Sequence, residues 1–343
     1  MEGGDRELID WRGTAPGPRR GRRPAALSSE VSVPRTPKVL VIGLDGALLA
    51  RIEDADAPHL AALTAAGLTA PSLVEPGAPT LSGPGWATIL TGARPAKHRV
   101  RDNSFTGHAF ARYPDFLTRL ASAERDLDTC AITSWAPLAE KVFSARVGTR
   151  VATPDAEYDA GTTDRAVAEL RHGNPDALFV QLDGIDDAGH RHGAASPRYL
   201  EAIHGADAQV GRMVAEVRAR PADEDWLVLV TADHGHTDTG GHGGPSLPER
   251  RTFLIAVGDG LAPGSVRTDV TMPDVAATAL AHLGVALDPA GTWTAAPCAR
   301  RRPPADRGGY GSAGADEGLS FGSGRIRARC QGPRARHDPN ERP

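Results

Sequence analysis

The chain has 343 residues, 40% of them hydrophobic, and a formal net charge of −4 at pH 7. Such a chain can bury a sizeable core, and its length fits a single α/β domain. The three cysteines are too few and too scattered for a disulfide framework or a thiolate metal site. Both ends, residues 1–37 and 297–343, carry more arginine than acid, so the part between them is acidic, which argues against a nucleic-acid-binding face.

The two ends of the chain lack the pattern of a folded segment. Residues 1–37 have arginine pairs but no apolar run long enough for a signal peptide, and residues 297–343 have almost no apolar periodicity. We expect both segments to be disordered and residues 38–296 to form the folded domain. The composition of residues 297–343 also fits an aberrant C-terminus. No stretch reaches the roughly 18 apolar residues of a membrane span. We therefore expect a cytoplasmic protein without membrane contact, or a secreted one if the start of the chain is wrongly assigned.

Predicted strands and helices alternate within the folded domain. The run "KVLVIGLDG" at 38–46 is apolar until it meets a charged residue, which is typical of strands covered on both faces. Similar patterns predict strands at 128–133, 177–182, 226–231 and 252–257, and helices at 57–67, 114–124, 162–172, 196–219 and 273–283. This alternation predicts a doubly wound α/β sheet, in which ligands bind outside the carboxyl ends of the strands.

Two motifs near the start of the domain contain candidate site residues. Asp45 in "VIGLDG" follows the first predicted strand, where a lone aspartate is commonly a turn or helix cap. Ser82 in "PTLSGPGWATILTG" precedes a helix that we predict to begin at Pro84. Because helix N-termini favour anions, this hydroxyl fits a phosphate neighbour, and it fits a helix N-cap equally well.

Two later motifs combine carboxylates with imidazoles. Asp186 and His190 in "DGIDDAGHRHG" are four residues apart, so a helix or tight turn would let both reach one cation. The stretch "TADHGHTDTGGHGG" places Asp233 and His234 directly after a strand and presents His242 from a glycine-rich loop. Each motif alone is compatible with a structural role, and only their combination indicates a metal site.

In order and spacing, the four motifs resemble the alkaline phosphatase superfamily, and within it the type I phosphodiesterase/nucleotide pyrophosphatase branch, over residues 38–290. The resemblance implies a three-layer α/β/α sandwich with a mostly parallel central sheet and two divalent metal ions, usually zinc. It also implies a metal-dependent phosphoric ester hydrolase that acts on small molecules through a phosphoserine. Either a phosphodiesterase/nucleotide pyrophosphatase or a phosphomonoesterase fits this description.

The resemblance assigns a role to each candidate residue. Ser82 stands where the family has its nucleophilic threonine or serine, which faces the metal ions, and Asn103 in "RDNSF" matches an asparagine that hydrogen-bonds a phosphoryl oxygen. The six implied metal ligands form two sets of three, Asp45, Asp233 and His234 for one ion and Asp186, His190 and His242 for the other.

These residue types suit two-metal chemistry. Aspartate and neutral histidine are the ligands that zinc accepts without cysteine, and such sets accept other divalent metals too. Two ions about 4 Å apart stabilise the attacking and leaving oxygens of an in-line displacement. A nearby cation also lowers the pKa of a serine hydroxyl, which is otherwise a weak nucleophile.

The chain departs from the family pattern near the nucleophile. Gly85 stands where phosphodiesterases commonly have asparagine, and Arg99 replaces a small residue, so the substrate is less well defined than the metal site. Thr80 offers a second hydroxyl nearby. We identify Ser82 as the nucleophile because of its spacing to Pro84.

Two other functions compete with the hydrolase. A sulfatase of the same fold would need the arginine of C/S-x-P-x-R, which "SGPGW" lacks, and an inactive relative would bind metal without catalysis. His236 and His192 fit either a place beside the ligands or a solvent-facing position. Trp86 and Phe105 fit either core packing or stacking on an aromatic leaving group.

Overall fold

The computed structural model describes residues 35–286 and 297–298. Its centre is an eight-stranded sheet with the strand order β4-β3-β5-β1-β6-β7-β2-β8. The strands are β1 (Thr36–Leu44), β2 (Leu68–Leu73), β3 (Thr129–Thr133), β4 (Thr149–Ala152), β5 (Ala177–Leu182), β6 (Glu224–Thr231), β7 (Arg251–Val257) and β8 (Ser265–Val266).

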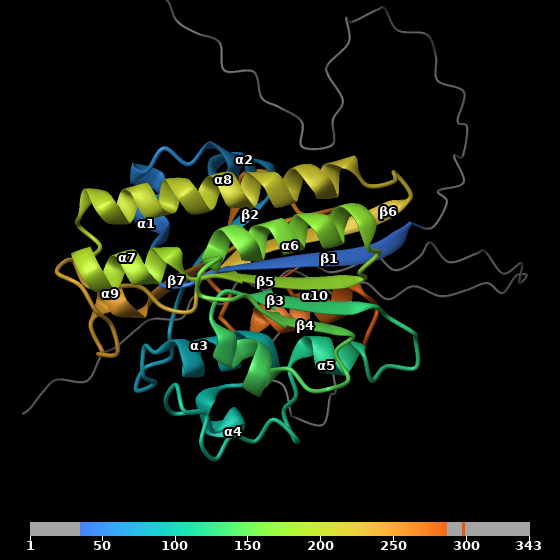
Figure 1. The fold of residues 1–343 in the computed structure, drawn as a ribbon, viewed down its shortest axis with the longest axis horizontal. Helices are drawn as coiled ribbons and strands as arrows, with labels where there is room; N and C mark the ends of the chain where they lie inside the picture. Colours follow the sequence, from blue (N-terminus) through green and yellow to red (C-terminus); the bar gives the residue numbers. More distant parts are fainter. Residues whose placement is uncertain (1–34, 287–296, 299–343) are drawn as a thin grey trace, which may run out of the picture. The chain divides into compact units, whose positions relative to one another are not determined.

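Helices surround this sheet (Figure 1). They are α1 (Leu49–Asp54), α2 (Pro58–Ala66), α3 (Ser82–Thr91), α4 (Pro95–His98), α5 (Phe116–Leu120), the π-helix η1 (Leu138–Val142), α6 (Tyr158–His172), α7 (Gly184–His192), α8 (Pro197–Ala219), α9 (Leu247–Arg250) and α10 (Asp274–His282).

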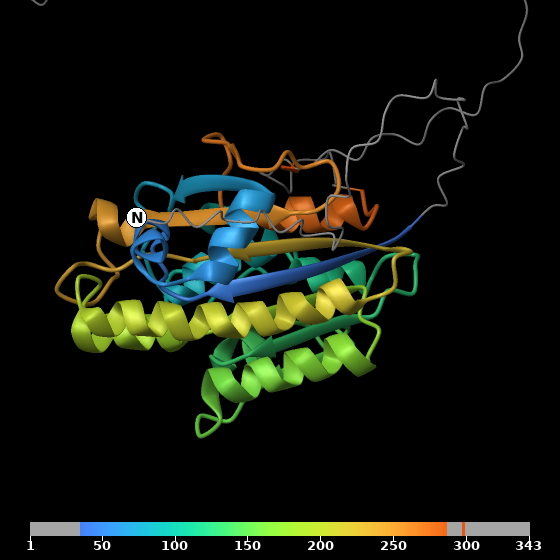
Figure 2. The same cartoon turned by 90° about the horizontal axis from the view of Figure 1, so that it is seen from above.

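The sheet is covered on both faces (Figures 1 and 2). Helices α2, α6 and α8 pack on one face, and α3, α5 and α10 pack on the other. The side chains of β1 alternate accordingly, because Leu40 and Ile42 join the first group while Val39 and Val41 join the second. The predicted three-layer α/β fold is therefore confirmed.

The sheet is mostly parallel. Strand β1 runs parallel to both neighbours, β5 and β6, whereas β7 is antiparallel to β6 and to β2. At the carboxyl end of β1, Leu44 pairs with Leu182 of β5 and Gly43 pairs with Thr231 of β6. The residues that follow these three strands therefore emerge side by side, which brings together segments far apart in the sequence.

All five predicted strands are present, and three strands were missed. Strand β2 contains Pro71, and a proline inside an apolar run argues against a strand. Strand β8 pairs only with Leu68 and Thr69, so the rest of β2 lies near the edge of the sheet, where proline is tolerated. The other two, β4 and β8, are too short and too exposed to give an apolar pattern.

The predicted helices are also present, with different ends. The prediction that α3 begins at Pro84 is wrong, because α3 begins at Ser82 with Leu81 as its N-cap. Helix α6 begins at Tyr158, before the predicted residue 162, and α5 is shorter than predicted, with Asp115 as its N-cap. Helix ends depend on tertiary contacts that a periodic pattern does not contain.

The described residues extend past both predicted domain boundaries. Thr36 and Pro37 already pair with β6. At the other end, the backbone N–H of Cys298 donates to Thr278 Oγ1 at 2.9 Å, and its carbonyl accepts from Arg267 at 3.1 Å. The remainder of the segments predicted to be disordered lies outside the described residues. In the part that is described, no helix is long and apolar enough to cross a membrane.

Candidate metal centre

Three adjacent strands deliver carboxylates to one edge of the sheet. Asp45 follows β1, Asp183 follows β5 and Asp233 comes two residues after the end of β6. The backbone N–H of Asp45 donates to the carbonyl of Leu182 at 3.0 Å, which ties the ends of β1 and β5 together. The carboxylates therefore meet because their strands are neighbours, as expected for the carboxyl edge of a parallel sheet.

The first group of candidate ligands consists of Asp45, Asp233 and His234, all fully buried. His234 Nε2 lies 3.6 Å from Asp45 Oδ1 and 3.2 Å from Asp233 Oδ2. The family resemblance predicts that these same three residues bind one ion. The structure brings their ligand atoms within 4.8 Å of one another.

In each aspartate of this group, one carboxylate oxygen accepts a hydrogen bond and the other accepts none from the described residues. Asp45 Oδ2 accepts from Trp86 Nε1 at 2.7 Å and from Gln181 Nε2 at 3.0 Å, and Asp233 Oδ1 accepts from the Gly46 N–H at 3.2 Å. Asp45 Oδ1 and Asp233 Oδ2 are buried without a hydrogen-bond partner among the described residues. Buried carboxylate oxygens need a compensating charge, so this arrangement fits a cation.

Burial also shifts the pKa values of this group. Burial raises the pKa of Asp45 well above its ordinary value, and the charges of Asp233 and Asp186 raise it further. Burial likewise raises the pKa of Asp233. Burial lowers the pKa of His234, so its imidazole is neutral, and its Nδ1 lies 3.2 Å from the carbonyl of Gly235. With the proton on Nδ1, the lone pair of Nε2 faces the two carboxylates.

The second group joins α7 to the glycine-rich loop. His190 Nε2 lies 3.3 Å from Asp186 Oδ2 and 2.9 Å from His242 Nε2, while His242 Nε2 lies 3.4 Å from Asp186 Oδ1. Ligands about 2.0–2.1 Å from a tetrahedral ion are about 3.3 Å apart, which is close to these separations. Two imidazole lone pairs that face each other at 2.9 Å repel unless a proton or a cation lies between them.

Thr80 holds the glycine-rich loop in place. Its carbonyl lies 2.6 Å from His242 Nδ1, which directs His242 Nε2 towards the ligand group. Its hydroxyl accepts from the Gly243 N–H at 2.8 Å and donates to the Gly244 carbonyl at 2.9 Å. The Thr80 hydroxyl is thus engaged with the loop, which weakens the alternative that Thr80 is the nucleophile.

Ser82 lies at the first residue of α3, and its Oγ is 3.4 Å from His234 Nε2. Leu81 is the N-cap, so Ser82 is not the helix cap that its sequence also allowed. The Gly83 N–H donates to Asn103 Oδ1 at 2.8 Å, Pro84 has no N–H, and the Gly85 N–H donates to Leu81. The first turn of α3 therefore offers fewer free N–H groups to an anion than a helix N-terminus usually does.

Two residues at this site, Gln181 and Tyr158, were not assigned a role from the sequence. Gln181 Nε2 donates to Asp183 Oδ1 at 3.0 Å as well as to Asp45, and the hydroxyl of Tyr158 donates to Asp183 Oδ2 at 2.9 Å. Trp86 and Phe105 are buried in the core, so stacking on a leaving group is wrong for both. No sequence signal pairs a strand glutamine with an aspartate two residues later.

The sequence did not decide whether His192 and His236 lie beside the ligands or face solvent, and the structure shows that the two differ in burial. His192 is exposed, whereas His236 is fully buried and its Nε2 lies 2.7 Å from Asp186 Oδ1. His236 also belongs to a candidate ligand group with Asp186, His234 and His242. Its spacing of two residues from His234 was the only available signal.

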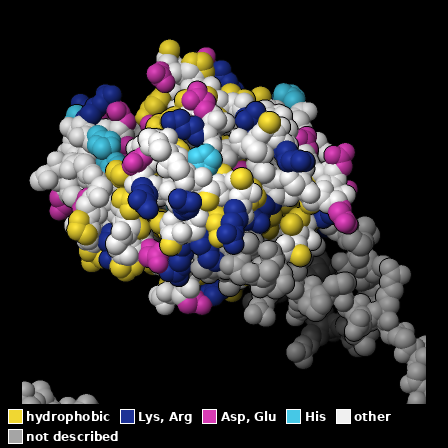
Figure 3. Space-filling model, turned by 90° about the horizontal axis from the view of Figure 1, so that it is seen from below, with side chains coloured by type: hydrophobic (Ala, Val, Ile, Leu, Met, Phe, Trp, Pro, Cys, Tyr) yellow, Lys and Arg dark blue, Asp and Glu magenta, His cyan; other side chains and the backbone are white. Residues whose placement is uncertain are grey.

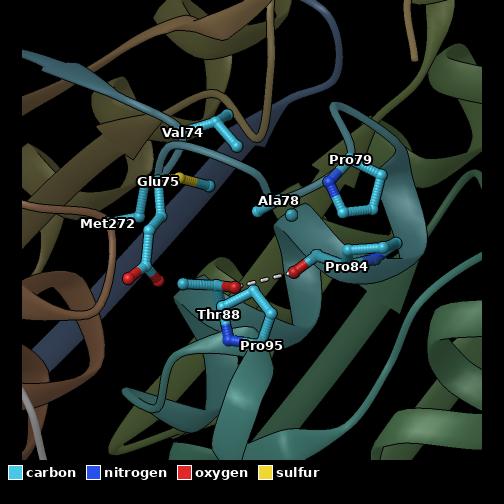
Figure 4. Close-up of a pocket in the computed structure, with 9 residues that line it drawn as sticks. Val74, Glu75, Ala78, Pro79, Pro84, Thr88, Pro95 and Met272 are labelled. Carbon is cyan, nitrogen blue, oxygen red and sulfur yellow. Dashed lines mark hydrogen bonds between the residues drawn. The ribbon is translucent and has the colours of Figure 1, made fainter. Parts of the chain in front are cut away.

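The opposite side of α3 has no room for a substrate. Figure 4 shows Thr88 of α3, whose hydroxyl donates to the Pro84 carbonyl at 2.8 Å, beside Glu75 and Met272. The cavity between these side chains is about 10 Å³, roughly the space of one water molecule. The cavity beside Thr88 is therefore too small to hold a substrate.

Comparisons with known proteins identify relatives over much of the chain. The family model described as type I phosphodiesterase / nucleotide pyrophosphatase matches residues 39–153 and 110–244, together more than half of the chain. The catalytic subunit of human GPI ethanolamine phosphate transferase 2 is 26% identical over 237 residues, 66% of this chain and 24% of that protein. A phosphopentomutase of Methylobacterium sp. is 34% identical over 182 residues, 52% of this chain and 40% of that protein. The chain spans less than half the length of these two relatives.

Solved structures share the fold. Murine ectonucleotide pyrophosphatase / phosphodiesterase 5 matches with a TM-score of 0.58 at 13% identity, over 74% of this chain and 96% of that chain. A 2-O GAG sulfatase matches with a TM-score of 0.59 at 16% identity, over 77% of this chain and 73% of that chain. These likenesses show the fold, and the family match shows that the chain belongs to the type I phosphodiesterase / nucleotide pyrophosphatase family, in a superfamily of enzymes that act on phosphoester groups.

Proposed function

We propose that this protein is a metal-dependent phosphoric ester hydrolase with Ser82 as its nucleophile. The observation that carries the proposal is the position of Ser82 Oγ, 3.4 Å from His234 Nε2. His234 belongs to the first group of candidate ligands, with Asp45 and Asp233, so a phosphate bound at that group lies against this hydroxyl. The fully buried carboxylates and their unpartnered oxygens support a cation at the same place.

Two divalent cations, for which zinc is the first choice, would supply positive charge to the phosphate oxygens and lower the pKa of the attacking hydroxyl. The residues that would hold them are those of the two groups, Asp45, Asp233 and His234 on one side and Asp186, His190 and His242 on the other. Trp86 and Gln181 orient Asp45, and Thr80 orients His242.

The protein residues carry the covalent steps. The Ser82 hydroxyl loses its proton to solvent, and Oγ forms a bond to phosphorus while the bond from phosphorus to the leaving oxygen breaks. Water then attacks phosphorus and gives up a proton, the bond to Oγ breaks, and Oγ takes up a proton to restore the hydroxyl. Asn103 Oδ1 accepts from the Gly83 N–H, so its amide NH₂ is left to donate to a non-bridging oxygen during both steps.

The surface near the site favours an anionic small molecule. Asn103 is exposed, and so are Arg99 and Arg101, which precede it in the chain. Figure 3 shows lysine and arginine side chains mixed with acidic and hydrophobic ones on the face of the molecule seen from below. Positive charge beside an active site raises the local concentration of anionic substrates.

A second candidate is transfer of the phosphoryl-containing group to an alcohol rather than to water. The observation that favours it is the match to the human GPI ethanolamine phosphate transferase 2 subunit over 66% of this chain. The first half of the reaction is the same, and only the acceptor of the second half differs. A sulfatase is disfavoured, because Trp86 occupies the arginine position of the C/S-x-P-x-R motif and is fully buried.

The test combines metal analysis with four assays on the full chain. We expect about two divalent ions per chain and hydrolysis of p-nitrophenyl phosphate or bis-p-nitrophenyl phosphate, with little hydrolysis of p-nitrophenyl sulfate. Addition of ethanolamine as an acceptor distinguishes transfer from hydrolysis, since a transferase forms phosphoethanolamine at the expense of free phosphate. A protein that binds no metal and cleaves none of these esters is not this enzyme.

A further inference from the structure

His236 occupies a slot that two distant glycines create. A Cβ atom on Gly46 would lie 2.8 Å from His236 Nε2, and a Cβ on Gly189 would lie 2.6 Å from the same atom. Gly46 follows β1, and Gly189 precedes His190 on α7. The imidazole of His236 is fully buried. It fills the space that side chains at residues 46 and 189 would otherwise occupy.

One nitrogen of this ring has a partner and the other has none. His236 Nε2 lies 2.7 Å from Asp186 Oδ1, whereas Nδ1 is buried without a hydrogen-bond partner among the described residues. A proton on Nε2 is donated to Asp186 Oδ1, whereas a proton on the buried Nδ1 would have no acceptor among the described residues, so the proton of His236 belongs on Nε2.

This arrangement suits a donor better than a metal ligand. Coordination through Nε2 would move the proton to Nδ1 and leave a buried N–H without an acceptor. The separation of 2.7 Å from Asp186 Oδ1 is also typical of a charge-assisted hydrogen bond, and shorter than the about 3.3 Å expected between two ligands of one tetrahedral ion.

We infer that His236 is a positioning residue, whose Nε2–H···Oδ1 hydrogen bond fixes Asp186 in the orientation that serves the cation site of Asp186, His190 and His242. The inference rests on the proposed function, since it assumes that this group binds a cation. It adds a residue outside the six sequence-derived ligands and explains why an imidazole is buried behind them. Outer hydrogen bonds of this kind change metal affinity by about 10–100-fold.

The experiment compares His236→Asn with His236→Gln in the purified, metal-stripped full chain. The glutamine Nε2 can reach the place of the imidazole Nε2 and donate to Asp186, whereas the asparagine amide is too short. We titrate Zn²⁺ by calorimetry and record the absorption spectrum of the Co²⁺-loaded proteins. His98→Gln is the matched control, because His98 is also fully buried and its Nε2 lies 3.0 Å from Thr88 Oγ1.

We expect His236→Asn to weaken one of two Zn²⁺ sites by about 10–100-fold, with an unchanged Co²⁺ spectrum at saturation, and His236→Gln to retain most of the affinity. His98→Gln should bind both ions normally. Equal Zn²⁺ affinities in wild type and His236→Asn would overturn the inference. So would loss of the site in both His236 variants with an altered Co²⁺ spectrum, since His236 would then be a ligand. If wild type binds no cation, the proposed function itself fails, independently of His236.

Discussion

Gly85 of α3 lies directly against the backbone of Asp233. A Cβ atom at residue 85 would be 2.9 Å from the carbonyl oxygen of Asp233 and 2.9 Å from its Cβ. This contact explains a departure from the family pattern that the sequence left open. Because Gly85 has no side chain, α3 can approach the backbone of Asp233 closely at the end of β6. The glycine at this position is therefore explained by packing and does not indicate which substrate the protein binds.

We predict that Gly85→Ala destabilises the protein and weakens cation binding at Asp233. In a solvent-exposed helix this exchange stabilises by about 1 kcal/mol, but here the added methyl meets backbone, and overpacking of this kind costs about 1–3 kcal/mol. Gly205→Ala is the control, since a Cβ there meets nothing within 4 Å. Chemical unfolding should show opposite signs for the two variants, and a stabilised Gly85→Ala protein would contradict the packing that we describe.

Much of the candidate site could be predicted because its residues follow buried strands. Asp45 and Asp233 stand at the ends of apolar runs, and parallel neighbours place such ends together. The spacing of four residues between Asp186 and His190 predicts that a helix brings them together. Both residues lie on α7, with His190 Nε2 close to Asp186 Oδ2. Local pattern and sheet topology were sufficient to place these residues at one edge of the sheet, whereas their assignment as ligands came from the family resemblance.

The rest depends on contacts that no local pattern encodes. The burial of His236 requires two glycines that are far from it in the sequence, Gly46 and Gly189. The fixed orientation of Asp45 requires Trp86 and Gln181, which read as ordinary core and strand residues. Such partners become visible only when the strands and helices are placed in three dimensions.

Removal of metal should lower both activity and stability. Without cations the buried group around Asp45 and Asp233 lacks the charge that its unpartnered oxygens require. An ion present at 100 times its dissociation constant stabilises the native state by about 2.7 kcal/mol. We expect EDTA to lower the thermal unfolding midpoint and Zn²⁺ to restore it, together with hydrolysis. Full activity and an unchanged midpoint in metal-free protein would exclude the proposed centre.

Asp115, the N-cap of α5, should make stability depend on pH. Burial raises the pKa of Asp115 from 3.8 to about 6, although its carboxylate accepts from the N–H and hydroxyl of Thr118. Because the folded state then holds a proton that the unfolded state has lost, this side chain reduces stability as pH rises from about 4 to about 6.

Asp115→Asn removes that dependence and can keep the N-cap hydrogen bond to Thr118. We expect the free energy of unfolding of the variant, relative to wild type, to increase by about 1 kcal/mol between pH 5 and pH 8. Urea titrations at the two pH values measure this difference directly. A constant difference between the two proteins would mean that the pKa of Asp115 is ordinary.

The decisive prediction concerns which hydroxyl becomes phosphorylated. Ser82→Ala should retain both cations, since the six ligand candidates remain, but lose turnover by roughly 10³-fold or more because the attacking group is gone. Thr80→Ala should behave differently. The Thr80 hydroxyl joins the backbones of Gly243 and Gly244, so its removal should loosen the loop that presents His242 and weaken metal binding, while added Zn²⁺ restores turnover.

Mapping a trapped phosphoenzyme separates these roles. After a rapid acid quench with substrate, we expect the label on Ser82 in wild type and in Thr80→Ala, and no label in Ser82→Ala. The reason is geometric: of these two hydroxyls, that of Ser82 lies beside His234, at 3.4 Å, whereas that of Thr80 is turned to the glycine-rich loop. A label on Thr80 would reassign the nucleophile. Inversion of configuration at phosphorus would instead require direct attack by water and would leave Ser82 to bind the cations or the phosphate.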